Sequence, residues 1–234
     1  MSYVLRMIEE GEHQQQDFKL RVDDPHKMAK TISAFANTDG GRLLIGVRDG
    51  GEIAGCRVEE EFHMIQCAAE MHCKPAVTFE SQVWKHGYSS VLEISIPKSA
   101  HRPHFVELNE AKPNQPRWQA FLRKDDKIHK ASPVMVKVWQ YQMRLDRSEF
   151  HYDEYVGRLF KRWREGQNLR FAQVARTARL EFKEAEDLLA LLTVWGIVEG
   201  QYGRQGYRYG LVSEEALSRL ESEGADAFRW KHAG

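Results

Sequence analysis

The sequence predicts an α+β protein in which a mixed sheet with few helices is followed by a small, mainly helical part. Two observations lead to this prediction. The first part has short apolar or alternating runs between turn residues, and the second part has apolar residues at helical spacing before a glycine-rich stretch. A length of 234 residues accommodates two domains. We place the boundary in the polar stretch 144–149, which gives domains 1–147 and 148–234.

The strands expected in the first part are short apolar runs bounded by Gly, Pro, Asp or Lys. They cover residues 16–22, 42–47, 77–84, 88–96 and 119–123. A helix over 26–36 follows Asp24, a capping residue, and Pro25, which favours a first helical position. The turn signal at Asp49-Gly50 predicts a hairpin from 42–47 into 53–55. Two further helices are expected over 58–71 and 134–147.

In the second part, helical spacing predicts helices over 152–165, 171–177 and 182–195. Three glycines, Gly200, Gly203 and Gly206, then indicate a hairpin, and a weakly amphipathic helix covers 213–230. The order helix, helix–turn–helix, hairpin resembles a winged helix. Helix 182–195 would be its recognition helix, with a more acidic than basic exposed face that suits DNA poorly. A protein-interaction role is the alternative use of this part.

The charge balance gives no overall signal for nucleic acid, because 34 Lys and Arg offset 34 Asp and Glu. Nucleic-acid binding would therefore depend on local patches. Two basic clusters are candidates, although such a cluster is often a solvated face: Arg158, Lys161, Arg162 and Arg164, and Arg117, Arg123, Lys124, Lys127 and Lys130.

The three cysteines form no CxxC pair, and their odd number argues against a disulfide framework. We therefore expect a cytoplasmic protein. No apolar run reaches the length of a bilayer span and the N-terminus lacks a signal-peptide pattern, so no membrane partner is expected. His63, Cys67, His72 and Cys73 lie close together and could bind zinc, but we favour buried helix positions for Cys67 and His63.

Three blocks follow one another near the N-terminus: EHQQQDFK at 12–19, ISAFANTDGGRLLIGVRD at 32–49 and GEIAG at 51–55. In residue types, order and spacing they resemble the Schlafen AlbA_2 family, over about residues 5–140. The resemblance implies an AlbA_2-type mixed sheet and a nucleic-acid-binding protein of the transcriptional-regulator type.

The glycine-rich segment of the second block has two interpretations. Gly40 and Gly41 allow a sharp turn from helix to strand, and Asn37 and Thr38 offer hydrogen bonds to the helix end. Either these residues form a tight turn and nothing else, or they contact a ligand. No Walker A pattern is present, so the motifs give no support for ATP binding.

In ribonuclease members of the family, three carboxylates are implicated in metal-dependent RNA cleavage. The resemblance matches them to Glu12, Asp17 and Asp49, which would be both catalytic residues and ligands of Mg²⁺ or Mn²⁺. Asp17 stands where the family usually has Glu, which shortens that arm. The alternative is that Asp17 pairs with Lys19 or Lys30 and that Asp49 caps the Asp49-Gly50 turn.

Candidate contacts to nucleic acid are basic residues and the residues of the glycine-rich segment. They are Lys19, Asn37, Thr38, Gly40, Gly41, Arg42, Arg123, Lys124, Arg176, Arg179, Arg204 and Arg208. Three aromatic residues of the expected sheet, Phe18, Trp118 and Phe121, could stack on bases, although strand aromatics are more often core.

Three functions remain open at this stage. The leading one is a homodimeric DNA- or RNA-binding protein, of the kind that regulates transcription. The alternative is a metal-dependent ribonuclease in which Glu12, Asp17 and Asp49 are catalytic, and in which Lys19, Arg42 and Arg123 hold phosphates. The third is a dimeric scaffold that binds protein. Whether the protein is an enzyme is thus left open.

Overall fold

The computed structural model describes residues 3–108, 117–143, 150–203 and 206–228, and the chain divides into two compact units, residues 1–131 and 132–234. This division differs from the boundary expected after residue 147. Helix α4 (Pro133–Met143) packs against α7 (Phe182–Val194), so it belongs to the second unit.

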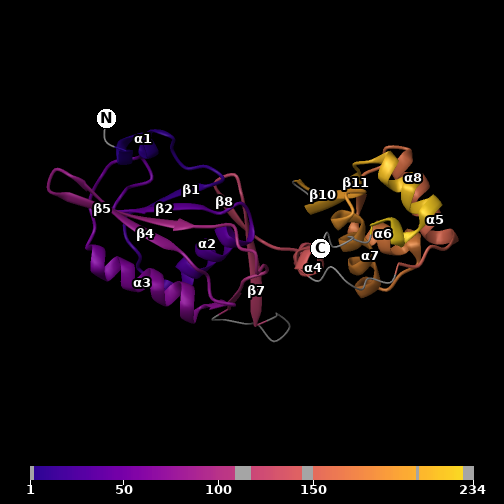
Figure 1. The fold of residues 1–234 in the computed structure, drawn as a ribbon, viewed down its shortest axis with the longest axis horizontal. Helices are drawn as coiled ribbons and strands as arrows, with labels where there is room; N and C mark the ends of the chain where they lie inside the picture. The colour runs from indigo at the N-terminus through magenta and orange to yellow at the C-terminus, as the bar shows by residue number, and fades with distance from the viewer. Residues whose placement is uncertain (1–2, 109–116, 144–149, 204–205, 229–234) are drawn as a thin grey trace, which may run out of the picture. The chain divides into compact units, whose positions relative to one another are not determined.

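The main sheet of the first unit has the strand order β1 (Gln16–Lys19), β2 (Gly41–Ile45), β5 (Ser89–Ile96) and β4 (Glu80–His86). Strands β1 and β2 are parallel, whereas β2 with β5 and β5 with β4 are antiparallel (Figure 1). The parallel pair requires a crossover, which helix α2 (Pro25–Asn37) provides. The predicted mixed sheet is therefore confirmed.

Helices cover both faces of this sheet. Helix α2 and α3 (Val58–Met71) pack on one face, where Leu43 and Ile45 contribute to the shared core. Helix α1 (Tyr3–Glu9) packs on the other face, where Leu44 points because neighbouring strand residues face opposite ways. The near-continuous apolar character of β2 follows from this burial on both sides.

Helix α2 begins as its sequence predicts. The Asp24 side chain accepts hydrogen bonds from the backbone N–H groups of His26 and Lys27, and Pro25 occupies the first helical position. These bonds lower the pKa of Asp24, the one from Lys27 most strongly.

The predicted hairpin from 42–47 into 53–55 is reduced to one isolated bridge between Val47 and Ile53. The reason is that both edges of β2 are already paired, one with β1 and one with β5.

A second sheet of the first unit has the order β3 (Cys73–Lys74), β6 (Phe105–Glu107), β7 (Trp118–Lys124) and β8 (Lys127–Lys130). Strand β7 corresponds to the expected strand 119–123 and packs against α2. Strands β3, β6 and β8 were not predicted, because they have too few residues for a recognisable alternation.

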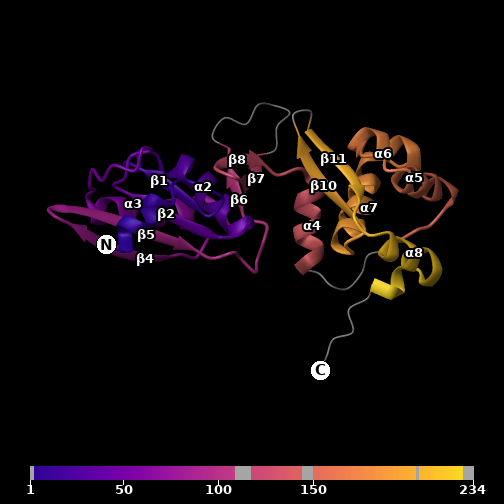
Figure 2. The same cartoon turned by 90° about the horizontal axis from the view of Figure 1, so that it is seen from above.

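The second unit begins with α4 and continues with α5 (Glu154–Arg164), β9 (Leu169–Arg170) and α6 (Phe171–Ala178). After α7 come the hairpin strands β10 (Val198–Gly203) and β11 (Gly206–Leu211), followed by α8 (Glu214–Glu223) and the 3-10 turn Ala225–Phe228. The strands form a sheet of order β10-β11-β9, and Figure 2 shows this hairpin beside the helices of its unit.

The predicted helices of this part are present with shifts of a few residues at their ends. The helix expected over 213–230 ends earlier, because Gly224 follows α8 with a φ of 72°, and residues 229–230 lie outside the described ranges. Helices combined with mixed and antiparallel sheets confirm the α+β class. Of the helices in the described ranges, none combines the length and the apolar character that a bilayer span requires.

Candidate nucleic-acid interface

Arg123 of β7 holds the segment that contains the first of the three sequence blocks. Its side chain is 1% exposed, and its guanidinium donates to the backbone oxygens of His13 and Gln16 and to the Asp17 carboxylate. The guanidinium carbon also lies 4.7 Å from the centre of the Phe35 ring. Arg123 therefore links β7, β1 and α2, and its burial leaves no surface for a phosphate.

The glutamines of the first block fix the same segment to the glycine-rich turn. The Gln14 amide donates to the Asp39 carboxylate and to the backbone oxygen of Arg123, at 3.0 Å in each case. The Gln15 side chain donates to the backbone oxygen of Asp39. The first and second sequence blocks thus form one hydrogen-bonded structure with β7.

Asn37 and Thr38 have internal partners. The Asn37 amide, which is fully buried, donates to the backbone oxygens of His104 and Phe121 and accepts from the backbone N–H of His104. The Thr38 hydroxyl donates to the Ala34 backbone oxygen and accepts from the Arg123 backbone N–H. Both side chains join α2 to the second sheet, which favours the structural interpretation of this segment.

Gly40 and Gly41 are required by the backbone. Both have positive φ angles, of 70° and 155° respectively. A Cβ at Gly40 would lie 2.7 Å from the backbone oxygen of Ile96, and one at Gly41 would lie 2.6 Å from the Phe35 ring. The tight-turn interpretation accounts for both residues.

Glu12 and Asp17 are brought together at the start of β1. A Glu12 carboxylate oxygen accepts from the backbone N–H of Phe18 at 2.9 Å, and the Glu12 and Asp17 side chains are close enough to share a hydrogen bond. Burial raises the pKa of Glu12, the hydrogen bond from Phe18 opposes this, and the negative charge of Asp17 raises it again. Glu12 therefore holds a proton more readily than an isolated Glu does.

Asp49 does not complete a carboxylate trio. It is exposed in the turn after β2, and the described residues contain no group of three His, Cys, Asp or Glu side chains that could hold a metal ion. This finding includes the His63, Cys67, His72 and Cys73 segment. Asp17 is moreover occupied, since one of its oxygens lies 2.6 Å from the Lys19 ammonium and the other 3.1 Å from Arg123. The predicted Mg²⁺ or Mn²⁺ ligands therefore do not fit this arrangement.

The other basic candidates of the first unit differ in exposure. The Lys19 ammonium pairs with Asp17. The sequence had left Lys19 and Lys30 open as partners of Asp17. The Arg42 guanidinium is held by Gln16 and Glu10, and Lys124 is exposed at the end of β7. Lys19 and Arg42 thus have their charge largely offset within the chain.

The three aromatic candidates do not form an open stacking platform. Phe18 and Phe121 are buried, at 1% and 6% exposure. Trp118 is half-buried, and the Lys74 ammonium lies 5.6 Å from the centre of its ring. Core packing is the role that the structure favours for Phe18 and Phe121.

In the second unit, the helix expected to read DNA is covered. Lys137 of α4 pairs with Glu186 at 3.3 Å and with Asp187 at 2.7 Å, and the Tyr141 hydroxyl donates to Asp187 at 2.6 Å. Sequence reasoning assigned α4 to the first domain, so it missed this contact. The acidic face of α7 offered a signal, because carboxylates that are partly withdrawn from solvent favour cationic partners.

The basic candidates of the second unit lie mainly outside α7. Arg176 of α6 is exposed, and Arg179 follows α6 and donates to the Tyr155 hydroxyl at 2.7 Å. Arg208 is exposed on β11, and Arg204 lies outside the described residues. The sequence also indicated a basic cluster on α5. One member of this cluster, Arg164, is engaged in ion pairs with Glu214 and Glu221 of α8.

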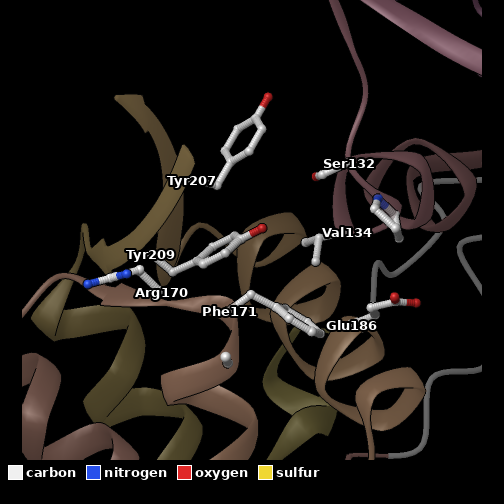
Figure 3. A pocket seen from close by; sticks show the side chains of 9 residues that line it. Ser132, Val134, Arg170, Phe171, Glu186, Tyr207 and Tyr209 are labelled. Carbon is white, nitrogen blue, oxygen red and sulfur yellow. The ribbon is translucent and has the colours of Figure 1, made fainter. Parts of the chain in front are cut away.

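A pocket of about 390 Å³ lies among the start of α4, the start of α6, α7 and β11. Figure 3 shows the rings of Phe171 and Tyr209 on its walls, while the Arg170 side chain extends away from Ser132. The Glu186 carboxylate, which lines the pocket, is already paired with Lys137. The pocket therefore offers mainly apolar contacts.

The family model described as "Schlafen, AlbA_2" matches residues 12–132. No curated protein matches the chain.

Two examples represent the solved structures that are similar to this chain. One is the N-terminal domain of a protein from Nitrosomonas europaea that is described as an ATP-dependent DNA helicase RecG-related protein. It is 21% identical with a TM-score of 0.39, and the match covers 50% of this chain and 88% of that one. The other is the DIP2311 protein from Corynebacterium diphtheriae, which is 17% identical with a TM-score of 0.42. That match covers 83% of this chain but 38% of the DIP2311 chain, so this chain spans well under half of its length.

The family match includes the Glu12–Lys19 segment, the glycine-rich turn and β7, which the contacts of Arg123 and Gln14 join into one structure. Because the family model matches more than half of the residues of this chain, the chain belongs to the Schlafen AlbA_2 family.

Proposed function

We propose that this protein binds nucleic acid without cleaving it, as a transcriptional regulator does. Membership of the Schlafen AlbA_2 family indicates a function related to nucleic acids. Binding without cleavage is supported by one observation in particular. Asp17, one of the three carboxylates expected to bind a metal, is paired with Lys19 and Arg123, while Asp49 is exposed in a separate turn.

The experiment uses the full chain with labelled single-stranded DNA, duplex DNA and a structured RNA. Each substrate is incubated with Mn²⁺ or with EDTA and analysed on native and on denaturing gels. We expect shifted but intact nucleic acid under both conditions, with affinity that falls steeply as salt increases. Failure to shift any of the three substrates at low salt would contradict the proposal.

A second candidate function, ribonuclease activity, is favoured by the approach of Glu12 to Asp17. Burial and the charge of Asp17 raise the pKa of Glu12, which is the behaviour of a group able to donate or accept a proton. RNA fragments on the denaturing gel that disappear in Glu12→Gln would favour this function. Fragments that persist in Glu12→Gln would point to a contaminating nuclease.

A further inference from the structure

We propose that the second unit holds the phosphate backbone of nucleic acid on the surface formed by α5 and α6, and not on α7. This inference rests on the proposed nucleic-acid binding and assigns a surface to it. The partner is identified by its chemistry, a chain of phosphodiester anions. The proposal departs from the sequence expectation, in which α7 is the recognition helix.

Helix α7 is neither basic nor available. Its N-terminal turn carries Glu181 and Glu184, and the Glu186 and Asp187 carboxylates face α4. The Lys137 ammonium also donates to the backbone oxygen of Lys183 at 2.9 Å. Insertion of α7 into a groove would have to break these contacts and bring carboxylates toward phosphates, which repel them.

Helices α5 and α6 form one continuous surface. The Arg162 guanidinium of α5 donates to the Thr177 hydroxyl of α6 at 2.8 Å, and Arg179 reaches Tyr155 of α5. Figure 2 shows the two helices beside each other, in agreement with their packing. This α5–α6 surface carries a set of cations: Arg158, Lys161, Arg162, Arg176 and Arg179.

The α5–α6 surface leaves part of its positive charge unbalanced. Lys161 and Arg176 are exposed and form no ion pair with the described part of the chain. Arg158 pairs with Glu154 at 3.5 Å, but both side chains are more than 60% exposed, so solvent weakens the pair. Arg164, on another side of α5, is fully engaged by Glu214 and Glu221.

The backbone at Arg179 is strained. Its φ of 51° places it in the left-handed region at the end of α6, where Gly is the usual residue. An L-residue is less stable there than in the right-handed region. The conformation projects the guanidinium over the Tyr155 ring at 4.3 Å, with Arg158 also 5.1 Å from that ring. Strain of this kind often accompanies function, and here it positions a cation on the proposed surface.

Because helix surfaces of this type contact phosphates and not base edges, binding should depend on salt more than on sequence. The experiment measures fluorescence anisotropy of labelled single-stranded DNA, duplex DNA and RNA with the full chain over a series of salt concentrations. The test variant is the double substitution Lys161→Gln and Arg176→Gln. The matched control is Lys183→Gln, which removes an exposed cation of α7.

For the double variant, we expect weaker binding and a salt slope, log K against log[salt], that is smaller by about 2 on duplex DNA, since each lost phosphate contact removes about 1. The control should retain the affinity and slope of the wild type. The DNA and RNA arms report which phosphodiester chain binds more tightly. An acidic poly-Glu peptide that displaces all three nucleic acids at equal charge concentration would overturn the proposal in favour of a protein partner.

Arg179→Gly separates binding from folding, because Gly relieves the left-handed strain while it removes the guanidinium. We expect the melting temperature of Arg179→Gly to stay within a few degrees of the wild-type value. Its binding to nucleic acid should be weaker. Wild-type affinity in both Arg179→Gly and the double variant, with weaker binding in Lys183→Gln, would overturn the surface assignment alone. No binding by the wild-type protein would overturn the proposed function, and the surface assignment with it.

Discussion

Arg123 and Asp17, which are 106 residues apart in the sequence, form a buried ion pair with 3.1 Å between the Arg123 Nη2 and Asp17 Oδ1 atoms. The pair joins β7 of the second sheet to β1 at the edge of the first. Removal of one charge would leave the other buried with fewer partners. Substitution of Arg123 therefore tests whether β7 holds the first sequence block in place.

The first prediction is that Arg123→Met lowers the free energy of unfolding by about 3 kcal/mol, because the buried Asp17 carboxylate keeps only Lys19 as a cationic partner and the backbone oxygens of His13 and Gln16 lose a donor. Chemical denaturation followed by circular dichroism measures this change. The control is Arg21→Gln, whose partner Asp23 is similarly exposed to solvent, and its cost should stay below about 1 kcal/mol. Equal costs for the two variants would show that the Arg123 pair is not structural.

The second prediction compares two glycines of the first unit. Gly41→Ala should destabilise by on the order of 1–3 kcal/mol, because its Cβ would lie 2.6 Å from the Phe35 ring at a φ of 155°. Gly50→Ala should have little effect, since nothing lies within 4 Å of its Cβ position. Thermal unfolding of both variants measures the difference. Similar melting temperatures would mean that the turn at Gly41 adapts to a side chain.

The third prediction concerns pH. Burial raises the pKa of Glu12 above its ordinary value of 4.5, so the folded protein keeps this proton to higher pH than the unfolded chain does. The folded state is therefore favoured by Glu12 below pH 4.5, and this contribution is lost as the pH rises through the raised pKa. Gln at this position can still accept from Phe18 but cannot titrate.

We therefore expect the stability of Glu12→Gln, relative to the wild type, to increase as the pH rises from about 4.5 toward neutrality. Denaturant midpoints measured for both proteins across this range provide the test. A constant difference between the two proteins at every pH would show that Glu12 titrates normally.

The fourth prediction concerns cysteine reactivity. Cys73 is 5% exposed, and burial raises the pKa of its thiol to about 12. Because the thiolate is the reactive form, Cys73 should resist Ellman's reagent in the folded protein and react after denaturation. Cys73→Ala should leave the number of thiols that react in the native state unchanged. A native count that falls in this variant would contradict the predicted burial.

The sequence by itself determined much of the local structure. The Asp24 cap, the Pro25 start of α2 and the apolar run of β2 each depend on neighbouring residues, and periodicity is read within one element. The three ordered blocks, which also lie close together in the chain, were sufficient to predict the family to which the chain belongs. The α5 cations and Arg179 were likewise visible as a pattern.

Tertiary structure decided what those residues do. The pairing of Asp17 with Arg123, the exposure of Asp49 in a separate turn and the cover of α7 by α4 all join or separate residues far apart in the chain. No local periodicity encodes such contacts, because they depend on which elements pack together. Charge in a sequence indicates a candidate site, but only burial and partners determine whether that charge remains available to a ligand.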